Sequence, residues 1–106
     1  MKQTEILLTI KLHQKLFIDP KRVRLLKEIK ECGSINQAAK NAKVSYKSAW
    51  DHLEAMNKIS PKPLLERNIG GKNGGGTSLT TYAERLLQLY DLLEQTQEHA
   101  FHLLQD

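Results

Sequence analysis

Apolar residues are spaced differently in successive parts of the chain, and each spacing predicts an element. Apolar and polar side chains alternate over residues 4–13, as at Ile10 and Leu12, which is typical of a half-buried strand. The segment 14–18 is apolar without a clear period. We therefore predict one N-terminal strand and assign no element to the segment that follows it.

A helix is predicted after this strand. Asp19 is a common N-cap residue and Pro20 suits the first helical position, so the helix is expected to begin there. Apolar residues then recur every three positions from 23 to 29, with charged residues on the other sides. Gly33 is expected to end the helix, because glycine readily adopts the left-handed conformation that closes many helices.

Two more helices are predicted to meet across a short turn. Ser34 and Gln37 have the spacing of a capping box, which opens a helix over residues 35–42. Ser45 is a suitable cap for the next helix, which covers residues 46–59 and ends before a proline. Small alanine side chains let the two helices cross closely, so the pattern predicts a helix-turn-helix.

The remaining sequence predicts a hairpin and a long helix. Strands are expected over residues 63–69 and 77–79, joined by a loop that holds most of the six glycines of the chain. Thr80 caps a last helix of about 25 residues, or nearly 40 Å at the rise of an α-helix. The predicted fold class is mostly α with a small β component, divided into a body (residues 1–80) and a C-terminal helix (residues 81–106).

The last helix carries an apolar stripe whose members recur in steps of three and four. They are Leu79, Ala83, Leu86, Tyr90, Leu93, Ala100 and Leu104. Such a stripe fits the seam between two paired helices, and it also fits a helix that merely covers its own domain. Because the helix is longer than a body of this size needs, we favour a homodimer paired through the stripe.

Composition narrows the class of protein. With 106 residues, 40% of them hydrophobic and 26% charged, the chain has the composition of one soluble domain. It has neither an apolar segment long enough to span a membrane nor a cleavable leader, so we expect a cytoplasmic protein without membrane contact. Cys32 is the only cysteine, which excludes an internal disulfide and a cysteine-based zinc site.

Charge is distributed unevenly along the chain. Residues 1–72 hold 15 Lys and Arg against 7 Asp and Glu, whereas residues 73–106 hold 1 against 5. A basic body favours a polyanion such as nucleic acid, because each neutralised phosphate releases counterions. An ordinary solvated basic surface is the alternative on charge alone.

The glycine-rich loop RNIGGKNGGGTS has some features of a nucleotide-binding loop and lacks the necessary ones. A P-loop has Ser or Thr after its lysine, whereas Asn73 follows Lys72, and Glu66 stands where the first P-loop glycine belongs. A strand is predicted after the loop where a P-loop leads into a helix. An oxyanion site here would need amide groups fixed in a concave nest, and we expect the loop to be mobile until DNA is bound.

No enzyme is indicated by the residues. His99 and His102 lie one helical turn apart, and neither a cysteine nor a third histidine is placed to complete a metal site. The serines that precede helices have capping roles, and no nucleophile elbow or acid and base partner accompanies them. We expect no catalytic residue, no bound metal and no cofactor in this chain.

Nucleic-acid binding accounts for these features together. In a helix-turn-helix the second helix enters the major groove, and its outward N-terminal residues contact base edges. Lys47 suits guanine or phosphate, Asp51 suits the amino group of cytosine, and Tyr46 suits phosphate or a thymine methyl. Trp50 lies at the margin of the apolar side of this helix, and we expect a core role for it rather than a base contact. The predicted DNA-contacting residues of this helix-turn-helix and the hairpin are Ser34, Ser45, Tyr46, Lys47, Ser48, Asp51, Arg67, Lys72 and Asn73.

The segments GSINQAAKNAKVSYKSAWDHLEAMN and LLERNIGGKNGGGTSLTTYAERLLQLYDLL resemble the N-terminal DNA-binding domain of the ModE family of molybdate-responsive transcription regulators. The resemblance covers nearly the whole chain, and a looser similarity extends to LysR-type winged helices. It implies a winged helix-turn-helix over residues 1–80 that binds double-stranded DNA, and a dimerisation helix over residues 81–106. It also implies control of genes for molybdate uptake or molybdoenzymes.

Two features depart from that family pattern. Full-length members sense molybdate through C-terminal oxyanion-binding domains, which these 106 residues do not contain, so molybdate would need a further domain. Lys43 stands in the turn where a left-handed backbone costs a lysine about 1 kcal/mol. The alternative function is a protein-interaction or dimerisation module that uses a winged-helix surface, and the transcription machinery is a further possible partner. The basic body favours DNA.

Overall fold

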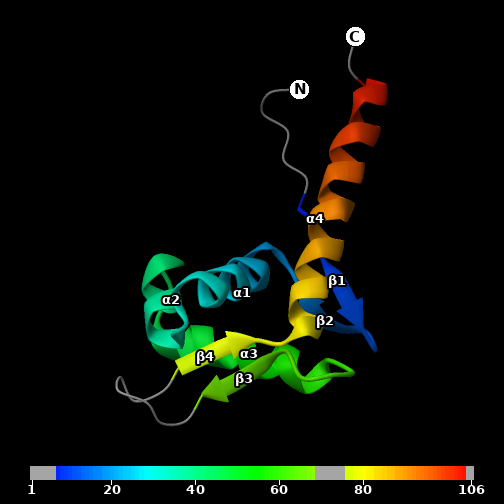
Figure 1. The fold of residues 1–106 in the computed structure, drawn as a ribbon. Coiled ribbons are helices and arrows are strands. Elements are labelled where there is room, and N and C mark those ends of the chain that lie inside the picture. The colour runs from blue at the N-terminus through cyan, green and yellow to red at the C-terminus, as the bar shows by residue number, and fades with distance from the viewer. Residues whose placement is uncertain (1–6, 69–75, 105–106) are drawn as a thin grey trace.

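The fold consists of three packed helices, two small hairpins and one projecting helix (Figure 1). The structure is a computed structural model that describes residues 7–68 and 76–104. Its elements are β1 (Ile10–Leu12), β2 (Lys15–Ile18), α1 (Pro20–Cys32), α2 (Ile35–Asn41), α3 (Tyr46–Ile59), β3 (Leu65–Asn68), β4 (Gly76–Leu79), α4 (Thr81–Phe101) and the short 3-10 helix η1 (His102–Leu104). The mostly α winged helix-turn-helix is confirmed.

The strand predicted over residues 4–13 is confirmed in part, and the segment after it, to which no element was assigned, holds a second strand. Residues 7–9 form no strand, β1 covers only residues 10–12, and residues 4–6 lie outside the described part. β2 pairs with β1 in antiparallel register. His13 and Gln14, with φ of 52° and 66°, make the two-residue connection that the sequence did not reveal.

The predicted helix caps are confirmed. Asp19, Ser34 and Ser45 each accept a hydrogen bond from the backbone N–H three residues later, at the starts of α1, α2 and α3. Gly33 closes α1 with φ of 69°, and Lys43 lies in the turn between α2 and α3 with φ of 60°. These local signals therefore determine where the three helices begin and how they are connected.

Several details differ from the predicted boundaries. In a full capping box the Gln37 side chain would also bond back to the Ser34 backbone N–H. Here the side-chain amide of Gln37 instead donates to Asn41 Oδ1 at 3.0 Å. That helix ends at Asn41, one residue earlier than predicted. In the second hairpin, β3 begins at Leu65 and β4 already begins at Gly76, while residue 69 lies outside the described part. These are end effects that leave the architecture unchanged.

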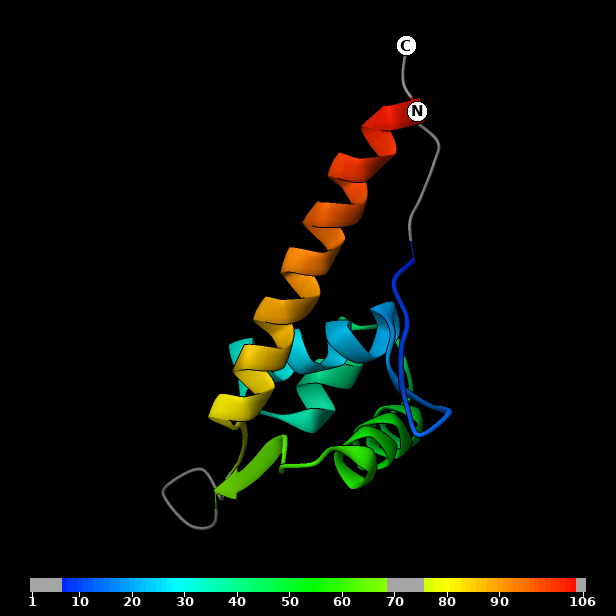
Figure 2. The same ribbon diagram turned by 90° about the vertical axis from the view of Figure 1, so that its right-hand side faces the viewer.

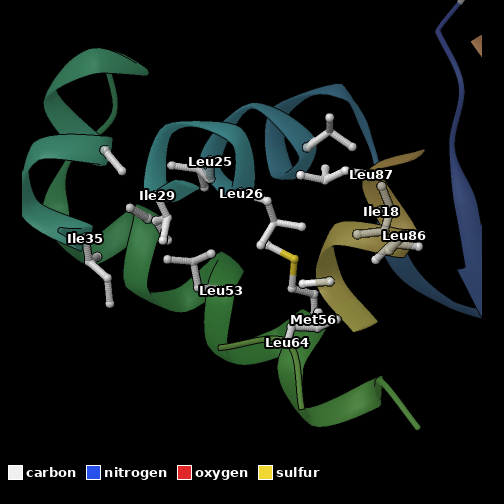
Figure 3. Packing of buried hydrophobic residues seen from close by; sticks show 14 of the residues in the cluster. Ile18, Leu25, Leu26, Ile29, Ile35, Leu53, Met56, Leu64, Leu86 and Leu87 are labelled. Carbon is white, nitrogen blue, oxygen red and sulfur yellow. The ribbon is translucent and has the colours of Figure 1, made fainter. Parts of the chain in front are cut away.

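The core lies where α1, α3 and the first half of α4 meet (Figure 3). Leu26 of α1 and Met56 of α3 are both fully buried and point toward one another in the centre of this view. Ile18 from β2 and Leu64 from the segment before β3 fill the sides of the cluster. Burial of each such side chain contributes roughly 1.5–3 kcal/mol, so the core holds α3 against α1.

Arg22 joins three elements in this core, although it is charged. Only 8% of the residue is exposed, and its guanidinium donates to the carbonyl oxygens of Leu16 (2.8 Å) and Phe17 (3.2 Å) in β2. Its Nε donates to Nδ1 of His52 in α3 at 3.1 Å. One side chain thus ties α1 to the N-terminal hairpin and to α3.

Helix α4 has two unlike halves. Ala83, Leu86, Leu87 and Tyr90 are buried against the body, and the Tyr90 hydroxyl donates to the Leu8 carbonyl at 2.8 Å. No described residue beyond Tyr90 in α4 is buried, and Figure 2 shows this half rising away from the β3–β4 hairpin. Among the described residues no helix is long and apolar enough to cross a bilayer.

Candidate nucleic-acid interface

The outward surface of α3 carries most of the predicted DNA-contacting residues. Its cap, Ser45, accepts from the Ser48 backbone N–H at 3.0 Å, so this hydroxyl already has a structural partner. Lys47 and Asp51 lie one turn apart and form an ion pair at 3.0 Å between Nζ and Oδ2. Because 84% of the Lys47 side chain is exposed, this pair is weakly held and both groups are available to a ligand.

Two other predicted DNA contacts of the helix-turn-helix, Tyr46 and Ser34, differ in their exposure. Tyr46, in the first turn of α3, is 53% exposed and therefore accessible. Ser34, at the start of α2, is half-buried, and its hydroxyl accepts from the Gln37 backbone N–H at 3.1 Å. Ser34 thus has a defined role as a helix cap, and contact with DNA stays a prediction for it.

The predicted place of Trp50 at the margin of the apolar side is confirmed, whereas the core role expected for it was wrong. Trp50 is 38% exposed, whereas Ala49 beside it is fully buried. In α3 the buried positions are Ala49, Leu53 and Met56, and Trp50 lies at the border of that row. Its indole is therefore part of the exposed surface of α3.

The wing is the antiparallel β3–β4 hairpin, with register pairs from Leu65 and Leu79 to Asn68 and Gly76. Arg67 is exposed on β3, opposite Thr77. Lys72 and Asn73, and the expectation that the glycine-rich loop is mobile, lie outside the described residues. Of the three predicted wing contacts, the structure therefore places only Arg67.

Backbone contacts join the wing to the end of α1. The Thr77 N–H donates to the Gly33 carbonyl at 2.9 Å, immediately before the helix-turn-helix. A Cβ atom at Gly76 would lie 2.7 Å from the same oxygen, which is too close for any residue but glycine. The wing and the start of α2 therefore share one anchoring point.

A second connection links the wing to α3. Asn57, near the end of α3, accepts a hydrogen bond from the Leu64 backbone N–H at 2.7 Å. The hydroxyl of Thr80 donates to the Pro63 carbonyl at 2.7 Å and also caps α4 through the Ala83 N–H. Sequence reasoning missed Asn57, because no local pattern marks a contact seven residues away outside the helix. These bonds fix the position of the β3–β4 hairpin beside α3.

The flank of α3 that faces α1 carries a histidine with an altered pKa. Burial lowers the pKa of His52 below its ordinary value, and the positive charges of Arg22 and Lys21 lower it further. Nδ1 of His52 accepts from Arg22 Nε, which requires that nitrogen to be unprotonated. This flank of α3 therefore presents a neutral imidazole to the body near neutral pH.

The predicted dimer stripe is divided by the structure. Ala83, Leu86 and Tyr90 are buried in the core of the same chain, and Leu79 is half-buried. Leu93, Ala100 and Leu104 are exposed. The exposed large apolar residues from Leu89 onward are Leu89, Leu92, Leu93, Leu103 and Leu104. Of the predicted stripe, the exposed members thus lie in the distal part of α4 and in η1, and dimerisation stays a prediction.

Metal-binding chemistry finds no support in the part of the chain that the structure describes. No group of three or more His, Cys, Asp or Glu side chains lies close enough there to hold a metal ion. The rings of His99 and His102 pack edge to face with centroids 5.9 Å apart. The described residues of α3 and the wing form a polar surface, in which three basic side chains are matched by three acidic ones: Lys47, Lys58 and Arg67 against Asp51, Glu54 and Glu66.

Comparison with known proteins gives matches along most of the chain. Residues 20–84 match the family model for bacterial regulatory helix-turn-helix proteins of the lysR family. The chain is 91% identical over 106 residues to "Transcriptional regulator ModE" of Haemophilus influenzae, covering all of this chain and 42% of that protein. It is 60% identical over 104 residues to the "DNA-binding transcriptional dual regulator ModE" of Escherichia coli, covering 98% of this chain and 40% of that protein.

A solved structure supports the fold independently of close sequence similarity. ArgP from Mycobacterium tuberculosis matches with a TM-score of 0.58 at 19% identity, over 81% of this chain and 30% of that chain. At this identity the likeness concerns the fold alone. The chain spans well under half the length of these curated relatives and of ArgP.

Proposed function

The chain belongs to the bacterial regulatory helix-turn-helix proteins of the lysR family, and we propose that it binds operator DNA as the DNA-binding part of a ModE-type transcription regulator. The observation that carries the proposal is the exposed N-terminal half of α3, held beside the wing by Asn57 and by the Gly33 carbonyl. α3 enters the major groove, and the wing contacts the neighbouring backbone. Figures 1 and 2 both place α3 and the wing at the end of the body away from the tip of α4.

Base recognition is assigned to the polar row of α3. Lys47 and Asp51 form an ion pair in the free chain, and on DNA they exchange it for a guanine acceptor and a cytosine amino group. The exchange is inexpensive because the pair is exposed, and such pairs contribute about 0–1 kcal/mol. Arg67 on the wing supplies a phosphate contact.

Pairing of two copies through the distal half of α4 completes the proposal. Ala100, Phe101, Leu103 and Leu104, with Gln97, line an open apolar groove of about 440 Å³. A second copy is the partner that covers it, because the exposed leucines continue this apolar row along the helix. The two α3 helices of such a dimer then lie on the same side and contact two half-sites of a two-fold operator.

The genes and the effector are inferred from the resemblance to the ModE family of molybdate-responsive regulators. We infer that the operators lie at genes for molybdate uptake or molybdoenzymes, and that the regulator acts in the cytoplasm without catalytic activity. We also infer that the effector site lies outside residues 1–106, so this chain binds no cofactor. Molybdate is therefore expected to leave DNA binding by this chain unchanged.

A mobility-shift titration tests the proposal at two salt concentrations, with palindromic DNA from upstream of molybdate-uptake genes. Lys47→Ala is expected to weaken operator binding by about 1–3 kcal/mol, and Arg67→Ala is expected to lower the salt slope by about 1. Lys30→Ala is the matched control, because it removes the same charge from α1, where Lys30 pairs with Glu84. If Lys47→Ala and Arg67→Ala bind operator DNA as tightly as the Lys30→Ala control at both salt concentrations, α3 and the wing are excluded as the DNA surface.

The same titration separates the second candidate function. A winged helix that binds only another protein should bind operator and unrelated DNA with equal, weak affinity that disappears at the higher salt. The uneven charge of the chain favours DNA, because residues 1–72, which include α3 and β3, hold 15 Lys and Arg against 7 Asp and Glu.

A further inference from the structure

Two aromatic side chains lie on one flank of α3. Tyr46 and Trp50 are one turn apart, so they are neighbours on the helix surface. Tyr46 is 53% exposed and Trp50 is 38% exposed. Among the described residues outside α4 and η1, Leu7 is the only other large apolar residue with comparable exposure. Single exposed apolar residues are common, but two adjacent ones on a helix make a strip.

The position of this strip on α3 is fixed by the helical period. At 3.6 residues per turn, Trp50 lies between the buried row that contains Leu53 and the polar row of Lys47 and Asp51. Asn57 continues the same flank two turns further on, and it accepts from the Leu64 N–H ahead of the wing. The aromatic strip of Tyr46 and Trp50 therefore lies beside the polar row of Lys47 and Asp51. It is on the same flank of α3 as Asn57, which holds the segment that leads to the wing.

The chemistry around the strip selects its partner. A protein partner would be expected to meet an apolar patch with few charges at its centre, whereas this strip adjoins the exposed Lys47. In the major groove the apolar group presented by the bases is the C5-methyl of thymine, which contacts apolar side chains. A helix that presents the exposed Lys47 beside an apolar flank is thus complementary to a groove wall that carries thymine methyl groups.

We propose that Tyr46 and Trp50 read thymine methyl groups, at base pairs next to those contacted by Lys47 and Asp51. The inference rests on the proposed binding of operator DNA and adds a specificity element to it. Burying one methyl group is worth a factor of about four in affinity. Each half-site is expected to contain one or two such thymines.

The decisive experiment changes the DNA first and the protein second. Operator duplexes in which single thymines are replaced by deoxyuridine lose one methyl group and keep every hydrogen-bonding group. The chain is expected to bind about fourfold more weakly when the methyl at a contacted position is missing. Trp50→Ala and Tyr46→Ala should each lose the penalty at their own position, whereas Trp50→Phe should retain much of it.

Controls separate this inference from the function on which it rests. Lys47→Ala should bind more weakly overall and keep the same thymine-to-deoxyuridine ratio, because it leaves the strip intact. Circular dichroism and binding to unrelated DNA at low salt report whether each variant is folded. The emission of Trp50, the single tryptophan, should also change when operator is added to the unmodified chain.

Three outcomes are distinguishable. A penalty that disappears only in the aromatic-to-alanine variants supports the inference. The inference is overturned, while specific DNA binding stands, if folded Trp50→Ala shows the same penalty as the unmodified chain at every position. It is also overturned if neither protein shows a penalty. Absence of specific operator binding by the unmodified chain overturns the proposed function itself.

Discussion

Replacing Arg22 with alanine should destabilise the fold far more than replacing any exposed arginine. The substitution removes the donors to the carbonyls of Leu16 and Phe17 and to Nδ1 of His52. A buried polar group left without a partner costs about 1–3 kcal/mol. Only the bond to Phe17 is buried and the other two are partly buried, so a total loss of about 2–4 kcal/mol is expected. That is a large share of the roughly 5–15 kcal/mol by which domains are stable.

Urea unfolding followed by Trp50 fluorescence measures this loss. For small domains the free energy falls by about 1–3 kcal/mol per molar urea, so the midpoint should fall by about 1–2 M. Arg24→Ala is the matched control, since Arg24 lies on the same helix with an exposed side chain. Its guanidinium pairs with Glu28 at 3.5 Å and donates an exposed hydrogen bond to the Asn41 carbonyl at 2.9 Å. The control should lose no more than about 1 kcal/mol. Similar midpoints for the two variants would refute the reasoning that Arg22 holds the three elements together.

Three further predictions concern pH, the wing and the dimer. Because the fold lowers the pKa of His52, the unfolded chain binds a proton at higher pH than the folded chain does. The free energy of unfolding should therefore fall as pH drops from about 6.5 through the lower pKa of the folded state. His52→Asn should make this fall in the urea midpoint shallower, and an unchanged pH slope would contradict the reasoning. Gly76→Ala should displace the wing from the Gly33 carbonyl and weaken operator binding severalfold in mobility shifts, and full affinity would show the contact to be dispensable. Leu92→Glu with Leu93→Glu should give a folded monomer in sedimentation and circular dichroism, and a persistent dimer would place the interface elsewhere.

Local chemistry explains which parts of the fold were predictable. The starts of α1, α2 and α3 are determined by cap residues within three positions, and all of them were recognised from the sequence. The left-handed residue Lys43 was identified from its place in a short turn. By contrast, the connection at His13 and Gln14 lacks the Asn or Gly typical of such turns, so β2 escaped detection.

Contacts between distant segments explain most of what was missed at the site. The bond from Leu64 to Asn57 and the bond from Arg22 to His52 depend on how elements pack, and no pattern along the chain marks them. Helical period placed Trp50 at the margin of the buried row, but it could not decide whether a side chain at that margin is covered by the rest of the fold. The candidate DNA-reading row itself was visible, since polar side chains follow the cap of α3.

The apolar period of α4 shows why a stripe does not identify its partner. Leu86 and Leu93 lie one heptad apart on the same side, and yet the first is 8% exposed and the second 36%. The difference arises because the body ends near Tyr90 while the helix continues. Charged replacement of Leu86 would therefore unfold the domain, whereas the same replacement beyond Tyr90 tests pairing alone. Since α3 and the wing lie at the other end of the body, DNA contact and pairing are expected to be separable by mutation.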